Sequence, residues 1–254
     1  MGISFRPNGM TSSAQALRYL ERRQEVVSNN LANASTDGFK GERTFGRLLE
    51  GSIPVVETQT DMRAGTMRPT GAPLDLALGG DGFLVVDGPE GERLTRGGAF
   101  RLDDMGRVVN AEGLPLLGEG GPIVIDPEVA RGMASQSRQG AGGVSGDAVI
   151  QVDRGGGVHV NGTSVGSLRV ESVPPGAQLE HVGGGLFLPP AVRTPVAADA
   201  RDVRQGFLEE SNVTPVSALV EMISVQRAYA NVQKVMTTLD AARGTTVTDI
   251  GRPV

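Results

Sequence analysis

Side chains that could carry out catalysis are few in this chain. A nucleophile–histidine–acid triad needs a histidine positioned by a carboxylate, and the only histidines are His159 and His181, each in a glycine-rich stretch. Paired carboxylates occur at residues 103–104 and 209–210, where turns and helix entries commonly hold acidic residues. We therefore expect no catalytic residues and predict that the protein is not an enzyme.

Cofactor and metal sites are not indicated either. Glycine clusters at 79–82, 155–157 and 183–185 do not match a Walker pattern, and none lies between a strand and a helix as the dinucleotide fingerprint requires. We interpret these clusters as hairpin turns. The chain has no cysteine, which excludes disulfides, thiolate catalysis and cysteine-ligated zinc. We predict no cofactor and no metal.

Composition limits the classes of partner. The net charge is −5, which implies no basic face, so we expect no nucleic-acid partner. No run of about 18 apolar residues is present, so we expect no membrane insertion. The first 17 residues lack the apolar segment of a secretory signal, and we expect any export to proceed without a cleaved signal peptide.

The two ends of the chain carry apolar residues at alternating steps of three and four, over residues 10–34 and 218–239. This spacing is typical of a coiled coil. We predict a first helix from about Thr11–Ser12 to Asn33 and a second from Pro215 to about Ala242. We call their apolar positions the seam and predict them as a subunit interface. The seam comprises Leu17, Leu20, Val27, Leu31, Ala218, Met222, Val225, Tyr229, Val232, Met236 and Leu239. Periodicity alone leaves open whether the seam packs within one chain or between chains.

The middle of the chain is predicted to be β-rich, because 37 glycines and 15 prolines indicate many tight turns. We predict an α+β fold in which long terminal helices form a coiled-coil layer and an all-β domain, sandwich- or barrel-like, is inserted between them. The expected division is an N-terminal helix and turn (1–39), an extended connector (40–73), a β-rich domain (74–200) and a C-terminal helix (201–254). A short helical piece is expected at 42–49 and a mobile loop at 131–147.

Four segments then resemble a known family. SNNLANASTDGFK (28–40) and the segment 206–240 resemble the N- and C-terminal signatures of the flagellar rod and hook axial proteins. Segments 73–86 and 94–123 are similar to the entry of that family's β-domain, and the four occur in the family's order. The matched signature positions are Asn29, Asn30, Leu31, Ala32, Asn33, Gly38, Phe39, Ser211, Asn212 and Val213.

The resemblance implies a structural subunit of the bacterial flagellar basal-body rod, located in the periplasm-spanning axis. Members of this family are exported by the flagellar type III apparatus and polymerise beneath a rod cap through their terminal helices. The implied partners are copies of the chain and other rod and hook axial proteins. The short path from Phe39 to Leu74 and the segment 116–123 favour the proximal-rod member, whereas 223–240 resembles the distal-rod and hook type, which we place second. A secreted β-domain binding module dimerised by its helices is the alternative from another class.

Three asparagines close the first predicted helix. Asparagine is a weak helix former whose amide bonds readily to backbone groups at helix ends. We therefore predict that Asn29, Asn30 and Asn33 determine where the helix passes into the connector.

Overall fold

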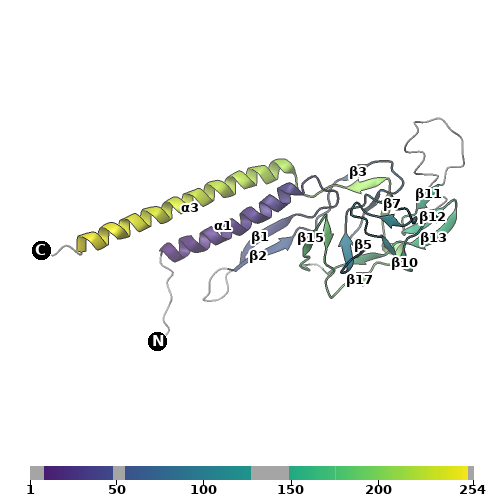
Figure 1. The fold of residues 1–254 in the computed structure, drawn as a ribbon, viewed down its shortest axis with the longest axis horizontal. Coiled ribbons are helices and arrows are strands. Elements are labelled where there is room, and N and C mark those ends of the chain that lie inside the picture. The colour runs from purple at the N-terminus through teal and green to yellow at the C-terminus, as the bar shows by residue number, and fades with distance from the viewer. Residues whose placement is uncertain (1–8, 48–54, 127–148, 175, 251–254) are drawn as a thin grey trace. The chain divides into compact units, whose positions relative to one another are not determined.

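The computed structural model describes residues 9–47, 55–126, 149–174 and 176–250, so the loop predicted at 131–147 lies outside the described residues. By its contacts the chain divides into two units (Figure 1). The helical unit comprises Met1–Ala34, Gly41–Asp61 and Val213–Val254. The β-rich unit comprises Ser35–Lys40 and Met62–Asn212. Each unit is therefore assembled from segments that are distant in sequence.

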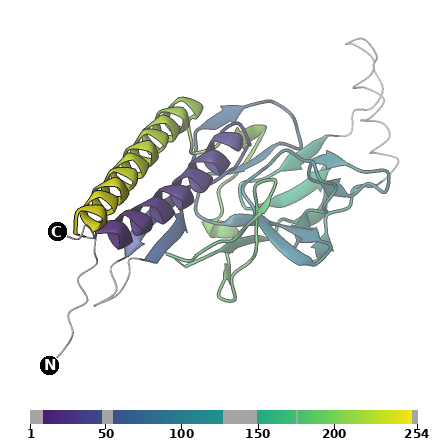
Figure 2. The same ribbon diagram turned by 60° about the vertical axis from the view of Figure 1, so that its left-hand side comes forward.

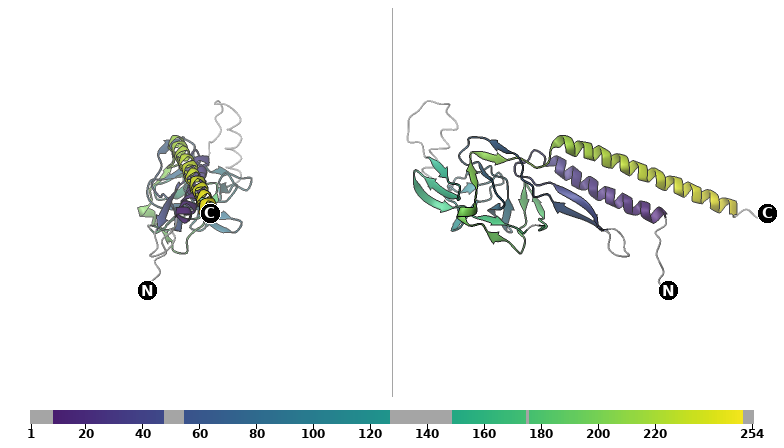
Figure 3. Two further views of the ribbon diagram at one scale, coloured as in Figure 1. Left: turned by 90° about the vertical axis from the view of Figure 1, so that its left-hand side faces the viewer. Right: turned by 180° about the vertical axis from the view of Figure 1, so that it is seen from behind.

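The helical unit consists of two long helices and a hairpin. Helix α1 spans Gly9–Ala32 and helix α3 spans Pro215–Ile250. The two helices run antiparallel side by side, and α3 continues past the start of α1 (Figures 1 and 3). Strands β1 (Glu42–Arg47) and β2 (Val55–Thr60) form an antiparallel hairpin. Helix α1 lies between α3 and this hairpin, so two of its sides are covered (Figure 1).

The start of α3 agrees with the sequence prediction and its end does not. Pro215 opens the helix, where its missing N–H is not needed. The preceding Thr214 carbonyl accepts a hydrogen bond from the Ala218 N–H at 3.1 Å. The predicted stop near Ala242 is wrong, because α3 continues through Gly244 to Ile250. A single glycine costs a helix only about 1 kcal/mol, and it terminates a helix only when it adopts the left-handed conformation.

The helical piece predicted at 42–49 is also wrong. Residues Glu42–Arg47 form strand β1, whose register with β2 runs from Glu42 opposite Thr60 to Arg47 opposite Val55. Thr44 and Phe45 favour strands, because branched and aromatic side chains fit the pleated surface. The predicted extended connector did not include a hairpin. Pairing with β2 therefore determines the local structure of residues 42–47.

The β-rich unit is built on one six-stranded antiparallel sheet. Its strands, in spatial order, are β15 (His181–Gly183), β16 (Leu186–Phe187), β6 (Gly91–Thr95), β5 (Phe83–Gly88), β14 (Val170–Ser172) and β17 (Thr194–Pro195). A three-stranded sheet contains β11 (Ile150–Val152), β12 (Gly157–Val160) and β13 (Thr163–Ser167).

Four two-stranded ribbons complete the described strands. They pair β3 (Met67–Pro69) with β19 (Phe207–Glu209), β4 (Leu76–Leu78) with β18 (Val203–Gln205), β7 (Arg101–Leu102) with β8 (Val108–Val109), and β9 (Leu117–Gly118) with β10 (Gly121–Pro122). A 3₁₀ turn, η1, spans Ala198–Ala200. Strands β18 and β19, which follow residue 200, pair with β4 and β3. The segment that enters the β-rich unit and the segment that leaves it are therefore joined by strand pairing (Figure 2).

Strand β5 is buried on both of its faces. Successive side chains of a strand point to opposite faces of the sheet. Phe83 and Val85 pack into one apolar cluster with Leu94, whereas Leu84 and Val86 belong to a larger cluster on the other face. Burial on both faces explains why FLVV is a continuous apolar run rather than an alternating one.

The structure is a mixture of helices and sheets, as the predicted α+β class requires. The coiled-coil geometry and the sandwich- or barrel-like arrangement stay predictions. None of the helices in the described part of the chain is long and apolar enough to cross a membrane.

Candidate assembly site

Seam residues line the contact between α1 and α3 to different extents. Four of them are buried: Leu20, Val27, Ala218 and Val225. The other seven are only partly buried: Leu17, Leu31, Met222, Tyr229, Val232, Met236 and Leu239. Helix α1 lies against α3, and a part of the seam stays accessible within one chain.

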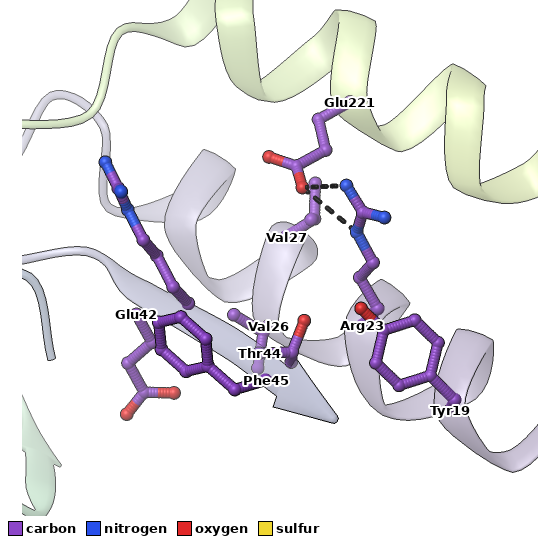
Figure 4. Close-up of a pocket in the computed structure, with 9 residues that line it drawn as sticks. Tyr19, Arg23, Val26, Val27, Glu42, Thr44, Phe45 and Glu221 are labelled. Atoms are coloured by element: carbon purple, nitrogen blue, oxygen red, sulfur yellow. Dashed lines mark hydrogen bonds and ion pairs between the residues drawn. The ribbon is translucent and has the colours of Figure 1, made fainter. Parts of the chain in front are cut away.

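Polar contacts also cross between the helices beside the seam. Arg23 of α1 donates to Oε1 of Glu221 on α3 from Nε at 3.1 Å and from Nη2 at 2.7 Å (Figure 4). The hydrogen bond to Glu221 raises the pKa of Arg23. The Tyr229 hydroxyl donates to Glu21 at 3.2 Å. Partly exposed pairs of this kind contribute little stability, so they orient the helices while the buried apolar residues hold them.

A groove of about 390 Å³ opens in the helical unit along α1, β1 and α3 (Figure 4). The Arg23–Glu221 pair borders it on one side, and Glu42 and Phe45 of β1 border it on the other. Val26 lies toward β1, whereas Val27 lies toward α3, and both are buried. Burial raises the pKa of Glu42, and the nearby charge of Arg22 opposes this shift.

The asparagines at the end of α1 make the contacts expected of a helix terminus. Asn30 is buried, and its amide donates to the Glu42 carbonyl at 2.8 Å while accepting from the Glu42 N–H at 2.9 Å. The side chain thus pairs with β1 as a neighbouring strand would. Asn33 donates to the Asn29 carbonyl at 3.0 Å. These contacts join the last turn of α1 to the first residue of β1.

The second part of the N-terminal signature lies in the β-rich unit. Gly38 has a φ of +71°, and a Cβ at this position would overlap the backbone of Arg96 and Gly97. Its N–H donates to the Glu209 carbonyl at 2.6 Å. Phe39 is buried against the His181 ring, with centroids 5.2 Å apart. Only glycine satisfies both the left-handed backbone and the close approach at position 38.

Sequence reasoning missed a buried network of charges centred on Glu209. This carboxylate is fully buried and accepts hydrogen bonds from the Lys40 ammonium, from the Gly65 N–H at 2.9 Å and from Arg96 Nη1 at 3.1 Å. Arg96 also donates to the Leu78 carbonyl at 3.1 Å. Its sequence context predicts only one of two ordinary acidic residues at a turn or helix entry. The only signal was its position in the C-terminal signature, because its partners are far away along the chain.

The C-terminal signature contacts the same region. The Asn212 N–H donates to the Phe39 carbonyl at 3.3 Å, and its amide donates to the Arg63 carbonyl at 3.0 Å. Ser211 and Val213 on either side are partly buried. Residues 38–40 and 209–212, which the two signatures supply, therefore meet in the β-rich unit.

Neither histidine is placed as the base of a catalytic triad. His159 lies 3.4 Å from Asp153 and is partly exposed. A hydrogen bond from the Gly157 N–H lowers the pKa of Asp153. His181 lies between the rings of Phe39 and Phe187, and burial lowers its pKa. Among the described residues, no group of three or more acidic, histidine or cysteine side chains could hold a metal ion.

Comparison with known families agrees with this arrangement. Residues 10–40 match the family model described as flagella basal body rod protein. Residues 77–159 match flagellar hook protein FlgE/F/G D1 domain, and residues 204–248 match flagellar basal body rod FlgEFG protein C-terminal. The first and third matches include the two helices and the signature segments that meet in the β-rich unit.

The chain is similar along most of its length to curated rod proteins. It is 33% identical over 228 residues to the flagellar basal-body rod protein FlgF of Mesorhizobium japonicum, covering 85% of this chain and 87% of that protein. It is 33% identical over 237 residues to FlgF of Escherichia coli, covering 87% and 89%. It is 30% identical over 246 residues to the rod protein FlgG of Buchnera aphidicola from Acyrthosiphon pisum, covering 85% and 89%.

The chain therefore belongs to the flagellar basal-body rod protein family. Its relatives are named FlgF and, at lower similarity, FlgG, as the predicted order of resemblance required. They are structural rod proteins, which confirms the prediction that the protein is not an enzyme.

Proposed function

We propose that the chain is a subunit of the axial rod, exported by the flagellar type III apparatus without a cleaved signal peptide and polymerised through its terminal helices. The observation that supports this most is the incomplete burial of the seam. Met222, Val232 and Met236 of α3 are only partly covered within one chain. A long helix gains most of its stability from packing its apolar face, so a further helix from a neighbouring subunit would stabilise α3.

Within this proposal the seam has two roles. The buried positions Leu20, Val27, Ala218 and Val225 hold α1 to α3 in each subunit. The partly covered positions complete a coiled-coil layer with adjacent subunits, which are copies of the chain and other rod and hook axial proteins. The rod cap and the export apparatus would be partners before and during assembly.

We place the subunit in the proximal rod first, on the basis of its similarity to relatives named FlgF. The distal rod comes second, because relatives named FlgG match a similar share of the chain.

Electron microscopy of basal bodies from a strain lacking this gene, scored together with motility, tests the proposal. We expect missing or truncated rods that the restored gene repairs, and the truncation point separates a proximal from a distal position. Intact rods in a motile deletion strain would contradict the proposed function.

A further inference from the structure

The hairpin between strands β12 and β13 turns at the pair Asn161–Gly162 (Figure 1). Val160 lies opposite Thr163, so these two residues form the whole loop. Both have a positive φ, +52° and +80°, which is the conformation of a type I′ turn. Among the residues that the structure describes, Asn161 is the one residue other than glycine with a positive φ. Both loop residues are exposed, so water reaches the side-chain amide.

An exposed asparagine followed by glycine can lose its side-chain amide without an enzyme. A Cβ at Gly162 would meet nothing within 4 Å, so neither the glycine nor its surroundings crowd the backbone nitrogen. Hydroxide removes the proton from this nitrogen, which then bonds to the Asn161 Cγ. The Cγ–Nδ2 bond breaks, and Nδ2 takes a proton from water and leaves as ammonia, which leaves a five-membered succinimide ring. Asparagine is accordingly among the thermolabile residues of proteins.

Water then opens the succinimide ring at one of its two carbonyls. Attack at Cγ breaks the new bond and leaves an aspartate at position 161. Attack at the main-chain carbonyl breaks the original peptide bond to Gly162, and the backbone then continues through Cβ and Cγ as isoaspartate. Both products carry a negative charge in place of a neutral amide. Isoaspartate also lengthens the loop by one backbone atom, which a two-residue turn cannot absorb without changing the strand register.

The closed turn holds Asn161 in a conformation from which this ring cannot form. Left-handed residues have a ψ of about +47°, which turns the nitrogen of the next residue away from Cβ. Two hydrogen bonds keep the residue in place. The Asn161 N–H donates to the Val149 carbonyl at 3.0 Å, and Oδ1 of Asn161 accepts from the Val149 N–H at 3.0 Å. Ring closure therefore requires the turn to open first.

We propose that Asn161 is a deamidation site that the folded hairpin protects and the opened chain exposes. A reaction that proceeds only from an opened state is slowed by the small population of that state, as amide hydrogen exchange is. The rate of deamidation at Asn161 therefore reports how much of the time the β12–β13 hairpin is open. The inference follows from the hairpin alone and does not depend on the proposed rod function.

Peptide mapping of the purified full-length protein tests the proposal. Samples are kept at mildly alkaline pH, with and without denaturing guanidinium chloride, and are digested with trypsin at successive times. Cleavage after Arg154 and Arg169 releases a peptide in which Asn161 is the only asparagine. Deamidation raises the mass of this peptide by about 1 Da, because an amide nitrogen is exchanged for oxygen.

The matched control is Asn231, which is also exposed but lies in α3 and is followed by Val232. Its tryptic peptide, residues 228–234, contains no other asparagine. In denaturant we expect Asn161 to deamidate about tenfold faster than Asn231, and also about tenfold faster than Asn161 in the folded protein. Equal rates for Asn161 with and without denaturant would overturn the protection by the hairpin. No excess over Asn231 in denaturant would overturn the site itself.

Two variants separate the chemical step from the opening of the turn. Gly162→Ala places a side chain beside the attacking nitrogen and should slow deamidation in denaturant about tenfold. Val149→Pro removes the N–H that Oδ1 of Asn161 accepts, and should speed deamidation in the folded protein about fivefold while leaving the rate in denaturant unchanged. Circular dichroism checks that this variant is folded. An unchanged rate in the folded variant would contradict the control of the turn by this hydrogen bond.

Discussion

Glycine 38 has two separate reasons to be glycine, and a matched residue distinguishes them. Gly38 and Gly71 have nearly the same φ, +71° and +73°, but a Cβ would meet the backbone of Arg96 and Gly97 only at Gly38. We expect Gly71→Ala to cost about 1 kcal/mol of unfolding free energy for the left-handed backbone. Gly38→Ala should cost several times more, on the order of 3 kcal/mol. Urea denaturation followed by circular dichroism measures both, and equal costs would contradict the role assigned to the close approach.

Glu209 is the centre of charge in the β-rich unit, with two buried cations beside it. Removing one partner of a buried ion pair leaves the other charge uncompensated, which costs about 3–5 kcal/mol. We expect Glu209→Gln to destabilise the protein by this amount in the same denaturation experiment. The control is Glu210→Gln, because the Glu210 side chain is 45% exposed and lies 3.3 Å from Arg68. A difference of less than about 1 kcal/mol between the two variants would mean that the network does not depend on the charge of Glu209.

His181 makes stability depend on pH in a defined direction. Burial lowers its pKa in the folded protein below the ordinary value of 6.5. The unfolded chain therefore binds the proton more readily, and stability falls as the pH falls from 6.5 to the folded pKa. We expect thermal unfolding to show this loss as the pH falls below about 6.5. His181→Phe keeps an aromatic ring against Phe39 and should flatten the curve. A curve that His181→Phe does not alter would assign the loss to other groups.

At the level of elements, the α1–α3 pair combines buried and accessible seam positions. We expect Val225→Asp, which places a charge at a residue 2% exposed, to abolish incorporation into the rod. Leu31→Asp should do the same. The neighbouring Gln226→Asp, on an exposed position, should incorporate normally. Immunoblots of purified basal bodies measure incorporation, and circular dichroism checks that the β-rich unit still folds. Normal incorporation of both seam variants would contradict the proposal that the seam is needed for assembly.

The elements that the sequence predicted well are those whose signal is local. The three-and-four spacing of the seam identified both helices, and Pro215 marked the start of α3. The helical piece predicted at 42–49 is wrong because nothing within this segment indicates the pairing with β2, which supplies the hydrogen bonds of β1. The predicted end of α3, at about Ala242, is too early because the sequence does not show that Gly244 keeps a helical backbone and that α3 continues to Ile250.

The sequence predicts the parts of the candidate site that depend on nearby residues and misses the parts that depend on residues far apart in the chain. Apolar faces and helix-terminal asparagines act on neighbours in the chain, and their roles could be proposed from spacing. The pairing of Lys40 with Glu209 joins residues 169 positions apart, and no periodicity connects them. Val216, Val220 and Ile223 could have been recognised as apolar positions at helical spacing, but their exposure is a property of the folded chain.

At the level of the whole molecule, the β-rich unit needs the segment before the hairpin as well as the residues after it. Ser35–Lys40 belongs to this unit by contact, although Gly41–Asp61 does not. A fragment of residues 35–212 retains Phe39 against His181 and Lys40 at Glu209, whereas a fragment of residues 62–212 loses both. We therefore expect the shorter fragment to be less stable by more than the roughly 3–5 kcal/mol of one lost buried partner, because Glu209 loses Lys40 and His181 also loses the Phe39 ring.

Differential scanning calorimetry of the two fragments measures this difference. A loss of this size lowers the melting temperature by roughly 10 °C or more in a domain of this length. Lys40→Met in the longer fragment serves as the control, because it removes the ammonium while keeping Phe39 and most of the side-chain volume. It should fall between the two fragments. Equal melting temperatures for the fragments would mean that the first signature does not stabilise the β-rich unit, and its Gly-Phe-Lys segment would then need a role in assembly instead.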